Sequence, residues 1–186
     1  MRIQRSAEHR IVPWANGLGI TADVFLWPPA IEEWTWRLSI ADVSDDVPFS
    51  VMAGIDRHIM VANGTGMALV IDGAPEVRMD EQFGPLAFDG DSVTTCRLID
   101  GPINDLNLMV RRGRALGSLR SIRLPAGSTL TTEPDDVAMV VLTGVLRLDN
   151  EPLSGFDAVL LDPDERLAFH ADDASWCAVA TVRPHG

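Results

Sequence analysis

The sequence has no lysine and no tyrosine, and only two of its 186 residues are cysteines. Without lysine there is no amine for Schiff-base chemistry, and without tyrosine there is no phenolic acid or base. Cys96 and Cys177 are too few for a disulfide framework and form no C-x-x-C pair, so we expect two reduced, buried cysteines. Polar chemistry must therefore come from Arg, Asp, Glu, His, Ser, Thr and Asn.

Long apolar runs are missing as well. The longest wholly apolar run covers residues 137–142 and is far shorter than the ~20 residues of a membrane span. The first residues, MRIQRS, are followed by no apolar stretch, so we predict no secretory signal and expect the cytoplasm as the compartment. The net charge of −12 and the pI near 4.6 make nucleic acid and anionic membrane surfaces poor partners.

Glycine and proline are scattered through the chain, and short runs of alternating apolar and polar residues lie between them. This pattern predicts an all-β sandwich or barrel with little helix. Residues 138–149 echo the stretch that begins at residue 59, which indicates a unit of roughly 90 residues that occurs twice. We therefore expect two small tandem β-barrels, 1–113 and 114–186, packed together.

Polar residues share strand faces in the first half of the chain. In residues 34–40, alternation places Arg37 and Ser39 opposite a row of apolar residues, and farther along Arg57 interrupts an apolar row. A third polar row occupies alternate positions of residues 105–111. Such mixed rows are typical of a cavity lining. The second half lacks them, so a single site is expected in the first half.

Residues 14–21, WANGLGIT, combine an aromatic side chain, an amide, two glycines and a hydroxyl. Glycine allows the backbone to approach a ligand closely, with Asn16 and Thr21 at the rim of such a turn. The spacing G-x-G-x-x-A from Gly17 also matches a dinucleotide fingerprint, which requires a following helix. Residues 22–29 are β-branched, aromatic and proline-rich, so we reject nucleotide binding.

Five pieces of the first half carry a resemblance to a known family. They are W-x-N-G-x-G-x-T from Trp14, R-x-S-x-A from Arg37, F-S with G-I-D-R from Phe49 to Arg57, G-x-G-M from Gly64, and D-G-P with D-x-N-L-M-x-R from Asp100 to Arg111. Taken in this order they resemble the HutD/Ves family, which are double-barrel members of the cupin superfamily. The resemblance implies a bicupin with a small-molecule pocket in the N-terminal barrel. It also implies a link to histidine utilisation, with N-formylglutamate or a related acid as a considered ligand.

The chain departs from the family pattern at four positions. Ala15 stands for a basic residue, Leu18 for a third glycine, Asp23 for a glutamate and Leu106 for an aromatic residue. Ala15 and Leu18 flank Asn16, where such changes alter which ligand is accepted. Ligand identity therefore transfers only loosely from the family.

We expect a cavity that binds a small anionic metabolite in a sensing or regulatory role. Arg37 and Arg57 would offer paired N–H donors to a carboxylate, because the guanidinium fork matches a carboxylate and stays charged when water is excluded. The alternative for these arginines is surface charge or internal ion pairing with Asp105 and other acids. The predicted ligand-binding residues are Asn16, Gly17, Thr21, Arg37, Ser39, Ser50, Arg57, Asn107 and Arg111.

The sequence also leaves room for other functions. Many cupins bind metal through an H-x-H pair, which the chain lacks; Asp56 and His58 could supply two ligands but no third is placed, so we expect no metal and no cofactor. In a metal-free lyase or isomerase of small carboxylic acids, Asp56, Asp105 or His58 would act as general base. An interaction protein that reports ligand status is a third class. A homodimer or a regulatory protein partner stays open, and we favour a binding protein over an enzyme.

Overall fold

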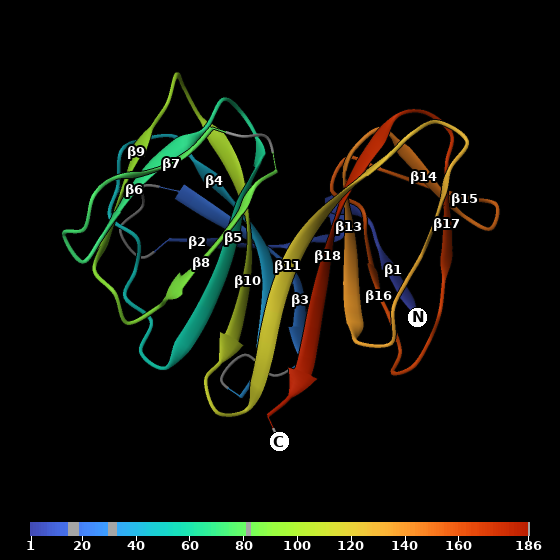
Figure 1. The fold of residues 1–186 in the computed structure, drawn as a ribbon, viewed down its shortest axis with the longest axis horizontal. Helices are drawn as coiled ribbons and strands as arrows, with labels where there is room; N and C mark the ends of the chain where they lie inside the picture. The colour runs from blue at the N-terminus through green and yellow to red at the C-terminus, as the bar shows by residue number, and fades with distance from the viewer. Residues whose placement is uncertain (15–18, 30–32, 81–82, 186) are drawn as a thin grey trace. The chain divides into compact units, whose positions relative to one another are not determined.

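The computed structural model describes residues 1–14, 19–29, 33–80 and 83–185, and these residues form β-strands and one short 3-10 helix (Figure 1). Every strand pair whose register the structure describes is antiparallel. The predicted all-β class with little helix is therefore confirmed. The chain divides into two compact units, each with two sheets.

The first unit comprises Arg10–Gly117 and the last residues of the chain. It contains a six-stranded sheet, ordered β2-β3-β4-β10-β5-β8, and a three-stranded sheet, ordered β7-β6-β9. Apolar side chains of both sheets, such as Ile59 and Val61 from one and Met67 and Leu69 from the other, form its core. The strands are β2 (Arg10–Pro13), β3 (Gly19–Trp27), β4 (Trp36–Val43), β5 (Ile55–Asn63), β6 (Met67–Ile71), β7 (Val77–Met79), β8 (Pro85–Asp89), β9 (Thr94–Leu98) and β10 (Ile103–Arg111).

The register of three neighbouring strands aligns the polar rows that the sequence predicted. β10 lies between β4 and β5, so that Asn107 is opposite Ser39 on one side and Ile59 on the other. One rung along, Met109 is opposite both Arg37 and Arg57. Cross-strand partners point to the same side of a sheet. The arginines, Ser39 and Asn107 therefore share one face of the sheet.

The second unit comprises Met1–His9 and Ser118–Arg183. Its five-stranded sheet is ordered β1-β16-β13-β18-β11 and its four-stranded sheet β12-β17-β14-β15. The expected ranges 1–113 and 114–186 differ from the units chiefly in the first nine residues, and two tandem domains stay a prediction. The elements are β1 (Arg2–Gln4), η1 (Ser6–Glu8), β11 (Ala115–Leu124), β12 (Thr129–Thr131), β13 (Asp136–Thr143), β14 (Val145–Leu148), β15 (Glu151–Ser154), β16 (Ala158–Leu160), β17 (Ala168–Ala171) and β18 (Ser175–Pro184).

The N-terminal segment belongs to the second unit because of specific contacts. β1 adds a strand to the edge of the five-stranded sheet by pairing with β16. Arg5 donates to the carbonyl oxygen of Pro152 at 2.7 Å and to the carboxylate of Asp157 at 2.9 Å. These hydrogen bonds fix residues that precede the first unit in the sequence.

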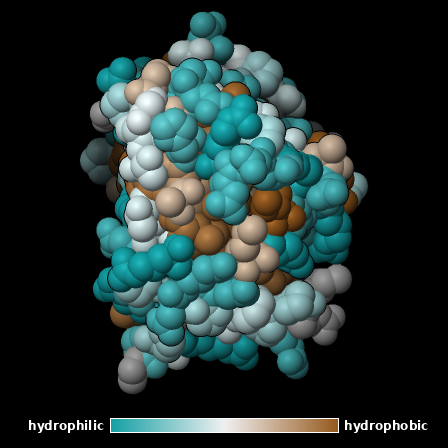
Figure 2. Space-filling view, turned by 90° about the vertical axis from the view of Figure 1, so that its right-hand side faces the viewer, coloured by the Kyte–Doolittle hydropathy of each residue, from teal (hydrophilic) through white to brown (hydrophobic). Residues whose placement is uncertain are grey.

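The surface is consistent with the composition of the chain. The face drawn in Figure 2 is mostly hydrophilic, with apolar residues gathered near its middle. Within the part of the chain that the structure describes, no helix has the length and apolar character needed to cross a membrane.

Candidate functional site

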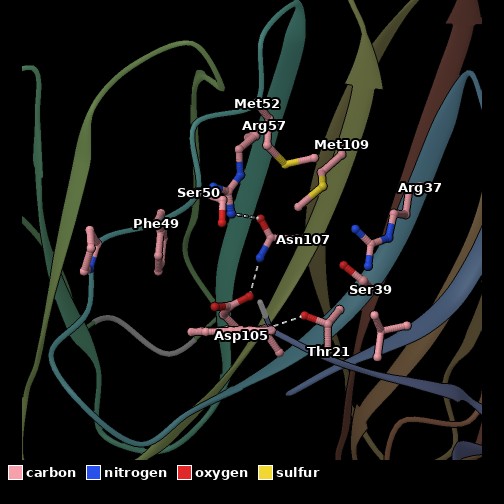
Figure 3. Close-up of a pocket in the computed structure, with 14 residues that line it drawn as sticks. Thr21, Arg37, Ser39, Phe49, Ser50, Met52, Arg57, Asp105, Asn107 and Met109 are labelled. Carbon is pink, nitrogen blue, oxygen red and sulfur yellow. Dashed lines mark hydrogen bonds between the residues drawn. The ribbon is translucent and has the colours of Figure 1, made fainter. Parts of the chain in front are cut away.

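A cavity of about 340 Å³ opens in the first unit, against the face shared by β4, β10 and β5 (Figure 3). Half of its lining residues are apolar and half are polar, a larger polar share than is usual for small-molecule sites. The lining residues are Val12, Trp14, Thr21, Arg37, Ser39, Ala41, Pro48, Phe49, Ser50, Met52, Arg57, Asp105, Asn107 and Met109.

Arg57 is the buried cation of this cavity, with 6% of its surface exposed. Its Nη2 donates a hydrogen bond of 2.8 Å to Oδ1 of Asn107, whereas its buried Nε–H has no partner among the described residues. The guanidinium carbon lies 4.9 Å from the ring centre of Phe49 and 5.0 Å from that of Phe88. Burial lowers the pKa of Arg57, the charge of Asp105 raises it, and that of Arg37 lowers it. The two rings hold a guanidinium group that retains an unused donor.

Asp105 lies next to this arginine on the cavity wall and is 1% exposed. Nδ2 of Asn107 donates to Oδ1 of Asp105, so the amide of Asn107 connects the carboxyl group to Arg57 (Figure 3). Burial raises the pKa of Asp105 to about 7, while Arg57 and the hydrogen bond from Asn107 act in the opposite direction. A carboxyl group of this kind exchanges its proton near neutral pH.

Arg37 has a different environment because a carboxylate holds it. Its Nε donates to Oδ1 of Asp23 at 2.7 Å, and Arg10 donates to the other carboxylate oxygen. The side chain of Asp23 is only 2% exposed, so this ion pair is partly desolvated. Internal ion pairing, which the sequence left open, therefore applies to Arg37, with Asp23 in place of Asp105. Arg37 still lines the cavity beside Ser39.

Trp14 and Thr21 form a further part of the wall. Nε1 of Trp14 donates to Oγ1 of Thr21 at 2.8 Å, and this bond joins the chain beyond β2 to β3. Gly19 permits the packing, because a Cβ at this position would lie 2.8 Å from the carbonyl oxygen of Asp42 and 3.0 Å from the ring of Trp14. The glycine-rich motif thus has a steric role at Gly19.

The structure brings most of the predicted ligand-binding residues together. Thr21, Arg37, Ser39, Ser50, Arg57 and Asn107 all line the cavity. Arg111 does not, although it shares the predicted face: its guanidinium carbon lies 4.7 Å from the ring centre of Trp34, and its Nε donates to the Trp34 carbonyl oxygen at 2.7 Å. Of the three predicted arginines, Arg37 and Arg57 therefore line the cavity and Arg111 does not. Asn16 and Gly17 lie outside the described residues, and ligand binding by any of these residues stays a prediction.

Sequence reasoning left some important residues out of the site. Alternation puts Asp105 in the polar row of residues 105–111, but the sequence offers it only as an ion-pair partner or a base and not as a ligand-binding residue, whereas the structure places it on the cavity wall. Asp23 was noted only as a departure from a family pattern. Its position opposite Ser39, beside Arg37, depends on the β3–β4 register, which contains a shift after Asp23. No local signal reveals such a shift.

The candidate metal ligands and general bases, Asp56, His58 and Asp105, lie in different surroundings. In the described part of the chain, no group of three or more His, Cys, Asp or Glu side chains is arranged to hold a metal ion. Asp56 accepts a hydrogen bond of 2.8 Å from Nε of Arg112, and neither Asp56 nor His58 lines the cavity. Burial lowers the pKa of His58, and the charge of Asp56 raises it. Of the three bases that the sequence offered, only Asp105 lies on the cavity wall.

Comparisons with known proteins agree with this fold. The HutD family model matches residues 6–179. Protein Ves of Citrobacter koseri is 32% identical over 168 residues, covering 84% of this chain and 85% of that protein. A 21.2 kDa protein from the hutC 3′ region of Pseudomonas putida is 37% identical over 110 residues, or 59% of this chain and 57% of that protein. The structure of HutD from Pseudomonas fluorescens SBW25, in a formate condition, is 28% identical, covers 98% of both chains and superposes with a TM-score of 0.82.

Proposed function

The chain belongs to the HutD family and has a cupin-like fold, and on this premise we propose that its N-terminal cavity binds a small organic carboxylate. We further propose that the bound acid is sensed or sequestered in a regulatory role. Acids of histidine utilisation, such as N-formylglutamate, are candidate ligands. The relative from the hutC 3′ region and the HutD structure support this assignment through their names alone.

The main support for the proposal comes from the surroundings of the Arg57 guanidinium group. Its guanidinium group is buried at the cavity wall, its Nε–H has no partner among the described residues, and none of their carboxylates lies within ion-pair distance. A buried charge without an ion partner is costly, and a ligand carboxylate would offset that cost. Arginine also presents donors in the planar arrangement that a carboxylate accepts.

The remaining lining supports an acid with an apolar portion. Met52, Met109 and Phe49 contribute flexible or aromatic apolar surface, while Ser50 contributes a hydroxyl (Figure 3). Methionine adapts to irregular ligand shapes. In a chain with a net charge of −12, a local cationic pocket would also concentrate an anion against the overall field.

A second candidate function has one observation in its favour. Asp105 is buried on the cavity wall and its pKa is raised by burial to about 7, which suits a general acid or base. A metal-free lyase or isomerase of small carboxylic acids would use it. Incubation of the protein with a bound acid, followed by mass spectrometry, distinguishes the two functions: an unchanged acid supports binding, and a product supports the enzyme.

Isothermal titration calorimetry with acetate, pentanoate, glutarate and levulinate, a keto acid, tests the binding proposal. We expect at least one of these acids to bind the wild type, and Arg57→Met to weaken that binding by about tenfold or more, because a charged hydrogen bond is lost. Arg57→Lys should be affected as well, since an ammonium lacks the planar fork. Arg147→Met is the matched control, because Arg147 pairs with Asp172 in the second unit.

The expected order of affinities is wild type and Arg147→Met above both Arg57 variants. Equal affinity in Arg57→Met and wild type, or no binding of any of the four acids, contradicts the proposal. A regulatory role additionally requires a protein partner whose association with the chain changes when the acid is added, and pull-down with and without the acid measures this.

A further inference from the structure

The side chains of Asp105, Asn107 and Arg57 form a continuous buried chain along one wall of the cavity (Figure 3). Asn107 uses its amide nitrogen toward Asp105 and its amide oxygen toward Arg57. Its orientation is thereby fixed from both ends. Among the described residues, Asn107 is the one hydrogen-bond donor to the Asp105 carboxyl group. The carboxyl group thus borders the cavity with unused hydrogen-bonding capacity.

We propose that the cavity takes up its carboxylate ligand together with one proton, and that Asp105 holds this proton and donates it in a hydrogen bond to a neutral oxygen of the ligand. The inference rests on the proposed function and specifies its ligand class: a small carboxylate that also carries a carbonyl or hydroxyl oxygen. The proton comes from solvent, and no other bond forms or breaks.

The reason is the charge balance of the site. With an ionised Asp105, an incoming carboxylate would meet a buried negative charge of its own sign on the wall, beside the cations Arg57 and Arg37, the second of which is already paired with Asp23. Like charges that share a buried site drive one of them to be neutral. Protonation of Asp105 leaves the cation Arg57 for the ligand carboxylate. It also converts the acid from an acceptor into a donor.

The charged groups around Asp105 contribute to its pKa. Arg57 on β5 favours the ionised form, and Asp42 on β4 disfavours it. Arg37 on β4 faces the same cavity but is paired with Asp23. On β9, burial raises the pKa of the Cys96 thiol to about 12, so that it is neutral.

His58 is a further titratable group, next to Arg57 in the sequence. It is adjacent to Arg57 on β5, so its side chain points to the opposite face of the strand. It does not line the cavity.

The ligand-binding affinity should depend on pH in a defined way. Burial raises the pKa of Asp105 to about 7. The site therefore holds its proton at about pH 6, and must acquire one at about pH 8. Affinity for levulinate should fall by about tenfold between these two pH values, although levulinate is fully ionised at both. Pentanoate, which lacks the second oxygen, should bind more weakly than levulinate at the lower pH.

Asp105→Asn is the decisive variant. Its amide oxygen still accepts from Asn107, and its amide nitrogen replaces the proposed donor at every pH. We expect the affinity of this variant for levulinate to be independent of pH and about tenfold higher than that of the wild type at about pH 8. A gain in affinity cannot result from misfolding. His58→Gln, the control for the nearby histidine, should keep the wild-type pH profile.

Calorimetry in buffers of different ionisation enthalpy gives a second readout, the number of protons taken up on binding. About one proton per levulinate is expected for the wild type at about pH 8, and none for Asp105→Asn. Binding through Arg57 with no proton uptake and no pH dependence would overturn this inference while leaving the proposed function intact. Failure of levulinate, pentanoate, acetate and glutarate to bind would overturn both.

Discussion

Each of the two units contains a large and a small sheet. The first unit holds a cavity lined in part by polar side chains, whereas the same region of the second is packed with apolar side chains. In the first unit, the central strands β4, β10 and β5 present arginine, serine, asparagine and aspartate to a cavity. In the second, β13 and β18 present Met139, Val141, Cys177 and Val179, which pack against apolar residues of β14, β15 and β17. The same arrangement of sheets is compatible with either kind of interior. The comparison therefore separates the residues that the fold requires from those that a site requires.

Buried polar groups also differ between the units. In the second unit, both carboxylate oxygens of Asp136 accept hydrogen bonds from Arg120, and Thr181 and the backbone N–H of Glu133 donate as well. In the first unit, Arg57 and Asp105 have one hydrogen bond each from the described residues, both to Asn107. Asp136 is thus saturated with partners, whereas Arg57 and Asp105 at the cavity keep hydrogen-bonding capacity for a ligand.

The largest effect should come from introducing the same residue, asparagine, into both interiors. Val141→Asn buries an amide among apolar side chains and should lower the free energy of unfolding by about 3–5 kcal/mol. Ala41→Asn places the same amide on the cavity wall, and the cost should be about 1 kcal/mol or less because the cavity can solvate it. Urea unfolding followed by circular dichroism measures both. Equal losses would mean that the cavity is no more tolerant of polar groups than the packed interior.

Strand alternation explains how much of this contrast the sequence could predict. The rows at Arg37 and Ser39, at Arg57, and at Asn107 each follow a period of two, and period alone predicts that each row lies on one face of its own strand. Arg111 obeys the same period, but it is the last residue of β10, where it stacks on Trp34. The point at which a polar row extends beyond the cavity depends on neighbouring chain segments. The alternation of residues along one strand carries no information about those segments.

Ion pairing was the least predictable part of the site. The sequence offered Asp105 as a partner for the arginines, whereas the structure pairs Arg37 with Asp23 and connects Arg57 to Asp105 only through Asn107. These partners are brought together by registers that include shifts on both β3–β4 and β10–β5. A one-residue change of register moves a side chain to the other face, so charge partners cannot be assigned from spacing alone.

A smaller effect is expected when an arginine is removed from each unit. Arg120→Met leaves the buried carboxylate of Asp136 without its main partner and should destabilise the protein by about 2–3 kcal/mol. Arg57→Met removes a buried charge that has no ion pair among the described residues, and methionine can keep the contacts with Phe49 and Phe88. Its free energy of unfolding should change by about 1 kcal/mol or less, while carboxylate binding weakens by about tenfold or more. A larger loss of stability in Arg57→Met than in Arg120→Met would make Arg57 a structural residue.

The last expected effect is a difference in the response of the two units to pH, which follows from their buried acids. Burial alone would raise the pKa of Asp136, but the hydrogen bonds from Arg120, the Glu133 backbone and Thr181 lower it overall, so its stabilisation is lost as the pH falls through the folded-state value. The pKa of Asp105 shifts in the opposite direction. Burial raises it to about 7, so the folded chain holds a proton that the unfolded chain releases. Stability should therefore fall as the pH rises, by up to about 1.4 kcal/mol per pH unit between about pH 4 and pH 7.

Asp105→Asn isolates this contribution because it keeps the shape of the side chain and removes the titration. The variant should match the wild type at about pH 4, be more stable than the wild type at about pH 7, and lose the decline between them. Asp136→Asn should instead be less stable than the wild type at about pH 7, since a charged acceptor of the Arg120 fork is lost. Tryptophan fluorescence during urea unfolding reports mainly on the first unit, which contains Trp14, Trp27, Trp34 and Trp36, whereas the second contains Trp176. If Asp105→Asn declines with pH as the wild type does, the proton must be held elsewhere, and the contrast between the two interiors no longer extends to their buried acids.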